Sequence, residues 1–139
     1  MATSVYLSNP AIKINSVDLT DQCTAATITY TVEALENTAF GSTARTYTSG
    51  LQNNSITVTL YQSYAATETE ASIFSLVGST CSIELSPTAA GLTTPSATAP
   101  KYSLSAAYLE THTPINASLG ELSTIDLVFT GSALTKATS

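Results

Sequence analysis

Alternation of apolar and polar residues is the main pattern along the 139-residue chain, and alternation of this kind predicts β-strands. The clearest example is residues 27–34, where Ile28, Tyr30 and Val32 fall on one face and threonines on the other. β-branched threonine packs well on a pleated, half-exposed surface. We therefore expect the threonine face to meet solvent, a channel or a neighbouring subunit.

Other segments show the same alternation and predict further strands. They are residues 11–19, 55–61, 81–86, 101–110 and 122–130. Asn15-Ser16 predicts a bulge or turn inside the first of them. Because Pro10 bars regular ladder pairing, residues 1–10 are predicted to be a loosely held arm. Residues 131–139 are predicted to be a polar tail.

One stretch, at about residues 67–78, has helical spacing instead. Thr67-Glu68-Thr69-Glu70 matches a capping box, and Ile73, Phe74 and Val77 would form the buried stripe. Gly78 would close the helix in a left-handed conformation. The chain therefore predicts a single, mainly β domain: a sandwich or barrel with one flanking helix.

A long Ser/Thr/Gly-rich connection at residues 37–53 separates two of the predicted strands. Hairpin loops usually have two to about five residues, and loops beyond about 12 are usually functional or disordered. We expect this loop to contact another copy of the chain, with Phe40 as its apolar anchor on its own sheet or on the neighbour. The residues of this predicted contact are Thr38, Ala39, Phe40, Gly41, Arg45, Tyr47, Gly50 and Leu51.

Charged residues are scarce, and most of them are acidic. Charged residues make up 10% of the chain, against roughly 25% in an average soluble domain, and the formal net charge is −6. The basic residues are Lys13, Arg45, Lys101 and Lys136, and no two are neighbours. Nucleic-acid binding needs clustered Lys and Arg, so we expect none. A weakly self-repelling surface suits self-assembly, although a β-rich extracellular domain has the same composition.

The sequence shows neither a targeting signal nor a membrane span. Residues 1–4 have no basic character, no apolar stretch follows them, and no run approaches the roughly 18 apolar residues of a membrane helix. We therefore expect synthesis and assembly in a cytoplasm. Cys23 and Cys81 are predicted to be reduced and structural there, with a disulfide between them left open.

Residues that could perform catalysis do not form a recognisable set. His112 is the only histidine, which argues against a metal centre, and no nucleophile elbow or phosphate loop is present. Glu68 and Glu70 are explained by the helix start. The acids on predicted strands have two interpretations, a solvated sheet face or a ring of negative charge lining a channel; they are Glu33, Glu84, Glu110 and Asp126. We expect no enzyme activity, no cofactor and no metal.

Tyrosines raise the alternative of a sugar-binding platform. Alternation places Tyr30, Tyr102 and Tyr108 with the buried set, so core packing is the favoured interpretation. The absence of tryptophan further weakens the case for a carbohydrate-binding module.

Three short motifs resemble the major tail tube proteins of long, non-contractile (siphovirus-type) phage tails, notably those of phages of actinobacteria. They are Leu35-Glu36-Asn37-Thr38-Ala39-Phe40-Gly41, then Gly50-Leu51 before the strand that ends Tyr61-Gln62-Ser63-Tyr64, and finally the segment at residues 120–131. The resemblance spans about residues 11–136, including the order of helix, strand, proline-rich loop and strand. Ser63 stands where that pattern commonly has Asp.

The resemblance implies a virion protein of the phage tail. Six copies would form a ring, and rings would stack into a hollow tube through which DNA passes without specific binding. The inner sheets would join into a barrel around the lumen, and the long loop and terminal arms would contact the next ring. The family also implies a tape measure protein and tail-end proteins as partners, and no membrane.

Two other functions remain as alternatives. One is an immunoglobulin-like phage surface or adhesion module that binds host glycans, which would require exposed aromatic side chains. The other is a hydrolase, which the missing nucleophile and base disfavour.

Overall fold

The predicted strands pair into one antiparallel sheet of eight strands in the computed structural model, which describes residues 10–139. The order across the sheet is β2 (Val17–Asp18), β1 (Ala11–Ile14), β7 (Thr80–Ser86), β8 (Lys101–Leu109), β9 (Thr124–Thr130), β6 (Ser55–Tyr61) and β3 (Cys23–Thr29), and β10 (Leu134–Ala137) also pairs with β8. Two further strands, β4 (Val32–Glu36) and β5 (Tyr47–Gln52), form a separate ribbon. The prediction of a mainly β fold with one short helix is confirmed.

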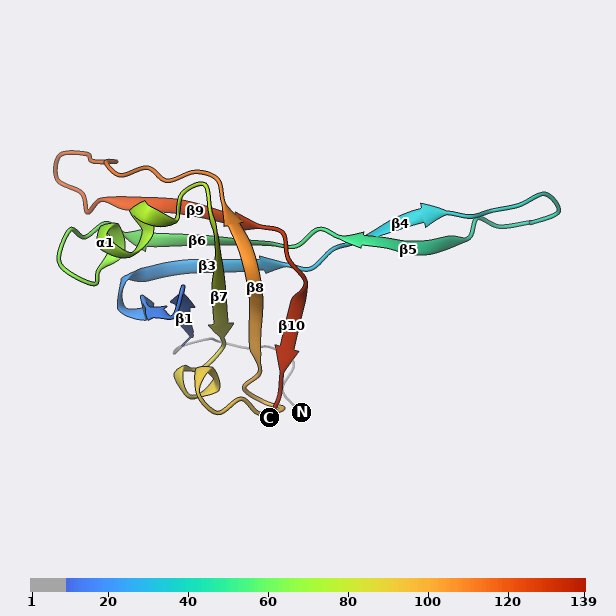
Figure 1. The fold of residues 1–139 in the computed structure, drawn as a ribbon, viewed down its shortest axis with the longest axis horizontal. Coiled ribbons are helices and arrows are strands. Elements are labelled where there is room, and N and C mark those ends of the chain that lie inside the picture. Colours follow the sequence, from blue (N-terminus) through green and yellow to red (C-terminus); the bar gives the residue numbers. More distant parts are fainter. Residues whose placement is uncertain (1–9) are drawn as a thin grey trace.

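The eight-stranded sheet folds over into two layers that cross each other (Figure 1). Strands β3, β6 and β9 run along the long axis of the molecule, whereas β7, β8 and β10 run across it. Strand β8 joins the layers, because its last residues, Tyr108 and Leu109, pair with Thr130 and Phe129 of β9. The hydrophobic core lies between the layers, and its fully buried side chains include Ile12, Ile14, Ile56, Leu60, Ile83, Leu104, Ile125, Leu127 and Phe129.

The period-two pattern places the core correctly in β6 and β9. Ile125, Leu127 and Phe129 are buried, while the residues between them are exposed, because successive side chains of a strand point to opposite faces. Phe129 lies opposite Ile56 in the ladder, so the two large side chains meet on the inner face. The predicted first strand also exists, as the hairpin β1–β2. Its turn is Asn15-Ser16, with φ of 51° and 68°, as a type I′ turn requires.

The predicted helix is shorter and begins differently. Helix α1 covers Thr69–Ile73 and continues as the 3₁₀ turn η2 (Phe74–Leu76). The capping box is wrong: Glu68 is the N-cap without a side-chain hydrogen bond, and Thr67 has φ of 63°.

The buried stripe of the helix is also only partly right. Ile73 is buried, but Phe74 and Val77 are exposed and Leu76 is buried instead. The tighter 3₁₀ winding after Ile73 changes which side chains face the sheet. Gly78 has φ of 81°, the left-handed conformation expected of it.

Two other segments differ from the sequence expectation. The predicted polar tail contains β10, which pairs with residues 101–104 of β8, so it forms part of the sheet. The long segment after β7 contains the 3₁₀ helix η3 (Ala89–Leu92), and a further 3₁₀ helix, η1 (Thr20–Gln22), precedes β3. The predicted N-terminal arm falls, except for Pro10, outside the described residues.

The tyrosines predicted for the core are not buried. Tyr30 and Tyr108 are exposed, and Tyr102 is half-buried. Tyr30 follows the end of β3, so the single strand assumed for residues 27–34 does not exist. In β8, the pairing register with β7 shifts between Cys81 and Ile83, and such a bulge moves the later side chains to the other face.

We expect Phe129→Ala to lower the free energy of unfolding by about 3–5 kcal/mol, because it opens a cavity in the core between the layers. Val128→Ala, on the exposed face of the same strand, is the matched control and should change it by less than about 1 kcal/mol. Urea unfolding measures both. Equal losses in the two variants would contradict the assigned faces of β9.

Candidate assembly site

An arm made of β4 and β5 projects from the body along the long axis of the molecule (Figure 1). Every residue of β4 is exposed, and β5 has one half-buried residue, Gly50. A two-stranded ribbon is marginally stable alone. This one nevertheless holds exposed apolar side chains, namely Val32, Leu35, Phe40, Tyr47 and Leu51. Contiguous exposed apolar surface is typical of interaction sites, which makes the arm the candidate site.

The tip of the arm, residues 37–46, is ordered by its own hydrogen bonds. The Asn37 amide donates to the Thr46 carbonyl at 2.9 Å, and the Thr46 amide donates to the Thr38 hydroxyl at 2.8 Å. The Thr46 hydroxyl donates to Asn37 Oδ1 at 2.7 Å. These bonds close the ribbon with polar side chains, so the tip keeps its shape without a core.

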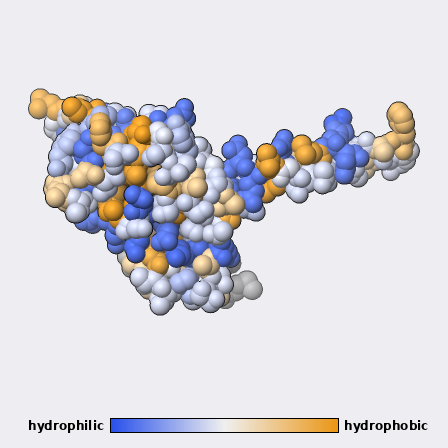
Figure 2. All heavy atoms as spheres, viewed as in Figure 1, coloured by the Kyte–Doolittle hydropathy of each residue, from blue (hydrophilic) through white to orange (hydrophobic). Residues whose placement is uncertain are grey.

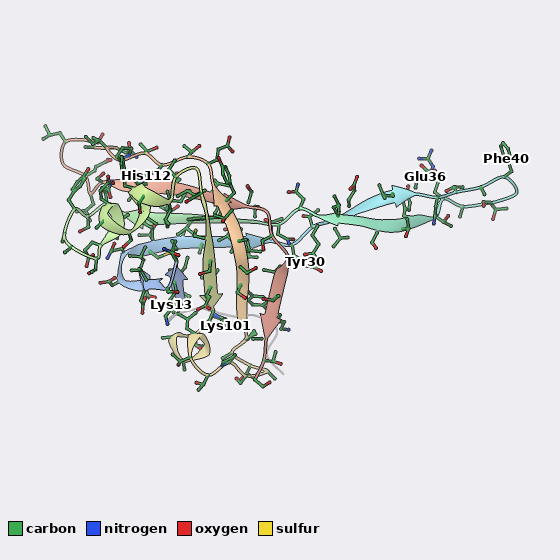
Figure 3. All side chains as sticks on the ribbon, in the orientation of Figure 1. Lys13, Tyr30, Glu36, Phe40, Lys101 and His112 are labelled. Atoms are coloured by element: carbon green, nitrogen blue, oxygen red, sulfur yellow. The ribbon has the colours of Figure 1, made fainter. Side chains whose placement is uncertain are left out.

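A tight turn at residues 39–42 ends the arm. The Ser42 amide donates to the Ala39 carbonyl at 3.3 Å, and Gly41, the third residue, has φ of 90°. A positive φ at that position is what a type II turn requires, and glycine adopts it freely. Phe40, the second residue, is fully exposed, and its side chain lies at the far end of the arm (Figure 3). Phe40 therefore does not pack on its own sheet.

The predicted contact residues divide between the tip and one strand. Thr38, Ala39, Phe40, Gly41 and Arg45 lie in the tip. The other three, Tyr47, Gly50 and Leu51, lie in β5. The predicted loop at residues 37–53 is therefore wrong over residues 47–52, which pair with β4 as a strand. Short polar residues masked the alternation there.

Gly50 has a local reason to be glycine. A Cβ atom added to it would lie 2.8 Å from Glu33 Oε2 and 3.1 Å from Glu33 Cβ. The side chain of Glu33 thus crosses the ribbon directly over Gly50. Tyr47 pairs with Glu36 and therefore lies on the face opposite Glu33, whereas the bulge between the Ala34–Ser49 and Val32–Gln52 pairs interrupts the alternation at Gly50 and Leu51.

Asn54 holds the base of the arm. It lies at the junction of β5 and β6, and its side chain is completely buried. Its Oδ1 accepts from the Thr31 amide at 3.2 Å, and its Nδ2 donates to Gln52 Oε1 at 2.9 Å and to the Ser132 carbonyl at 3.0 Å. Its own carbonyl accepts from the Gly131 amide at 3.1 Å. One side chain therefore links Thr31, just before β4, and Gln52, at the end of β5, to the turn between β9 and β10.

The acids proposed for a channel are not brought together. Asp126 lies on the exposed face of β9 and accepts from the Thr59 hydroxyl at 2.6 Å. Glu84 lies on β7 in the other layer, where Lys101 Nζ is 3.5 Å from its Oε1. Glu33 is in the arm, and Glu110 is exposed just after β8. Only Asp126 belongs to the layer of β3, β6 and β9.

The outer face of that layer carries mostly small side chains. Its exposed residues include Ala25, Thr27, Thr57, Asp126 and Val128. No Lys or Arg occurs in β3, β6 or β9. In the part of the chain that the structure describes, β3 pairs only with β6, so its other edge is open. The predicted threonine face is thus an exposed, nearly uncharged surface bordered by an open strand edge.

An apolar groove opens beside this edge, between the two layers. Its lining includes Ile12, Ala26, Ile28, Leu85 and Tyr102. Both cysteines are free thiols: Cys23 is half-buried and lines the groove, and Cys81 is buried in the core. Burial raises the pKa of both thiols, which keeps them protonated and unreactive at neutral pH.

His112, the only histidine, is the centre of a buried contact. Its side chain is 2% exposed, and its Nε2 lies 2.8 Å from Glu70 Oε2. The ring also meets Phe74 edge to face, with ring centroids 6.4 Å apart. No residue described by the structure bonds to its Nδ1. Glu70, assigned to a capping box from the sequence, thus holds the segment after β8.

Pro114 is a second attachment point of that segment. Its carbonyl accepts from Gln62 Nε2 and from the Tyr64 hydroxyl, both at 2.6 Å. Nearby, the buried Gln22 donates to Glu68, and the Thr69 hydroxyl lies within hydrogen-bonding distance of both Gln22 and the Tyr61 carbonyl. These contacts join residues up to 52 positions apart, so no local sequence signal could have shown them.

The segment at residues 110–123 carries apolar side chains that the sequence analysis missed. Ile115, Leu119 and Leu122 are strongly exposed, and Leu119 is fully so. This segment lies at the end of the body opposite the arm (Figures 1 and 2). We call residues 110–123 the far-end segment. Ile115 and Leu119 follow neither strand nor helix periodicity, so no element was predicted for them. Leu122 was predicted to begin the last strand, but β9 begins only at Thr124.

Across residues 10–139, no cluster of His, Cys, Asp and Glu could hold a metal ion. The same residues include no helix long and apolar enough to cross a membrane.

No protein-family model and no curated protein matches the sequence. The fold, in contrast, is similar to chains in solved structures of tail-like particles. A chain from the anti-feeding prophage cap (the AFP tube terminating cap) has a TM-score of 0.71 at 12% identity, over 100% of this chain and 94% of its own. A chain from the virion of a native gene transfer agent particle has 0.61 at 16% identity, over 96% and 99%.

A third structure is the tail of an empty gene transfer agent particle, refined helically with C6 symmetry. One of its chains has a TM-score of 0.52 at 14% identity, over 85% of this chain and 83% of its own. These likenesses show a shared fold over most of the chain, and they agree with the tail-tube-like fold that the sequence resemblance implied.

We expect Asn54→Ala to destabilise the protein by about 1–3 kcal/mol, because it leaves buried partners such as the Thr31 amide without a hydrogen bond. The amides at the base of the arm should also exchange faster with deuterium. Asn53→Ala, an exposed neighbour, is the control. Unchanged exchange in Asn54→Ala would show that the amide does not hold the arm.

We expect His112→Ala to cost about 1–3 kcal/mol and to speed amide exchange across residues 110–116, because Glu70 loses its buried partner. Thr113→Ala, at an exposed position of the same segment, should do neither. Thermal melts and exchange mass spectrometry provide the two measurements. Exchange that rises equally in both variants would contradict the anchoring role of His112.

Proposed function

We propose that this chain is a structural subunit of a phage-tail-like particle that assembles with copies of itself into stacked rings around a channel. The observation that carries the proposal is the exposed arm, which buries none of its apolar side chains on its own body. An arm of this kind needs a partner. The likeness of the fold to chains of tail-like particles supports a partner of the same kind, another copy in the assembly.

The channel wall in this proposal is the layer of β3, β6 and β9. Its outer face carries mainly threonine and alanine, together with Val128 and Tyr61, a single acid and no base. Phosphate groups find no cation there, so DNA could pass without being held. The open edge of β3 can pair with a strand of the neighbouring copy, which is how a ring removes exposed sheet edges.

The finer features rest on the sequence resemblance. They are a virion tail as the location, a siphovirus-type tail of an actinobacterial phage, assembly in the host cytoplasm, and a tape measure protein and tail-end proteins as partners. Six copies per ring is likewise a proposal. It draws support from the C6 symmetry of the gene transfer agent tail. In this role the chain is a non-enzyme without cofactor.

An adhesion module that binds host glycans is the second candidate. The exposed tyrosines Tyr30 and Tyr64 favour it, since sugar rings stack on aromatic side chains. This candidate predicts glycan binding by a protein that does not form rings.

Electron microscopy of the purified full-length chain should show rings and, at higher concentration, tubes. A variant in which Asn-Gly replaces residues 38–45 should stay folded by circular dichroism and form single rings without tubes, because the tip is closed by its own hydrogen bonds and holds no core. Thr43→Ala, in the same tip, is the control and should form tubes.

A wild-type chain that stays monomeric at every concentration, with glycan binding, would replace the assembly proposal with the adhesion candidate. Tubes of normal length in the shortened variant would remove the arm from the assembly role. Loss of folding in that variant would show that the arm serves the fold of its own chain.

A further inference from the structure

The two ends of the molecule carry turns of the same construction. At residues 118–121, the Glu121 amide donates to the Ser118 carbonyl at 3.2 Å, and Gly120, the third residue, has φ of 84°. The arm tip has the same arrangement, with Gly41 as the third residue. In both turns the second residue is apolar and fully exposed: Leu119 in the body and Phe40 in the arm.

The far-end segment is held in place although it has no regular secondary structure. His112 and Pro114 attach its first part to α1 and to the residues after β6. Asn116 Nδ2 donates to the Thr124 carbonyl at 2.8 Å, and the Ser123 hydroxyl donates to the Asn116 carbonyl. A surface that is already ordered pays less conformational entropy when it binds a partner.

The charges at the two ends are opposite. Arg45 is the only charged residue of the tip, residues 37–46. The far-end segment carries Glu110 and Glu121, both exposed, and no Lys or Arg. Two far-end segments would therefore repel each other, as would two tips. A tip and a far-end segment attract each other, and both also present apolar side chains.

The arm tip and the far-end segment lie at opposite ends of the molecule, which favours a second copy of the chain as the partner. Phe40 and the far-end segment lie at opposite ends of the long axis (Figures 1 and 3). A contact between one copy's tip and the next copy's far end is heterologous, so after each addition the growing assembly still offers one free tip and one free far end. Such a contact extends an assembly into an open stack whenever its rotation does not close into a ring.

We propose that the far-end segment is the surface that receives the arm tip of a copy in the next ring, with Phe40 packing on Leu119 and its apolar neighbours and Arg45 facing Glu121. The inference rests on the proposed function and names the surface that the arm contacts. It also explains why Ile115, Leu119 and Leu122 remain exposed on a body whose other leucine and isoleucine side chains, within residues 10–139, are buried or half-buried.

A charge exchange between the two ends tests the pairing. Arg45→Glu and Glu121→Arg should each lower the pelleted mass of tubes about tenfold at low salt, because each places like charges against each other. The double variant should restore tube formation, since it reverses the pair. Leu119→Asp should abolish tubes. Glu36→Arg, on the arm outside the tip, is the matched control and should leave tubes unchanged.

The outcomes separate this inference from the proposed function. Rings without tubes in the single variants, with tubes in the double variant, support it. If tubes form normally in Leu119→Asp and Glu121→Arg but not in the chain with the shortened tip, the arm contacts another surface and this inference is overturned while the proposed function stands. If the wild type forms neither rings nor tubes, the proposed function fails first.

Discussion

The buried amide of Asn54 is the constraint on which the rest of the structure depends. Asn54 lies between β5 and β6, and its side chain contacts both the connection from β3 to β4 and the turn from β9 to β10. A buried amide is tolerated only when its donors and acceptor are satisfied, and here all three bonds go to segments that meet at the base of the arm. The cost of breaking them fixes the direction of the arm relative to the core.

In the rest of the architecture, the hydrophobic core is separate from the two parts that we propose for assembly. The core between the crossed layers is made of aliphatic side chains and Phe129, and it is complete without the arm or the far-end segment. The arm is held by the β4–β5 ladder and by side-chain hydrogen bonds at Thr38 and Thr46. The far-end segment is held by side-chain hydrogen bonds to and from His112 and to the Pro114 carbonyl. Each can therefore present exposed apolar residues, because neither depends on them for its own shape.

The sequence predicted the parts of the fold that follow from local alternation. The buried faces of β6 and β9, the turn at Asn15-Ser16 and the mainly β class all have local causes, and they were correct. The errors occurred where contacts with residues distant in the sequence determine the local structure. Thr67 does not cap the helix, and Tyr30 lies just after the end of β3, at the base of the arm. Residues 134–137, predicted as a tail, pair with β8.

The candidate site was predicted in part. Phe40, Gly41 and Arg45 were identified because they stand in a long polar stretch whose motif resembles a known family, and the structure places them at the arm tip. The far-end segment was missed, because its surface exists only through bonds from Glu70, Gln62 and Tyr64 that no periodicity encodes. Nothing in the local sequence around His112 indicates that its side chain will be buried.

The central claim is that the arm tip is an interface between copies, and hydrogen–deuterium exchange of the assembled and dissociated chain tests it most directly. The account predicts that assembly protects the amides of residues 39–45 and of the far-end segment, while amides of the buried core exchange equally slowly in both states. Tip amides that exchange as fast in the assembly as in the free chain would contradict it.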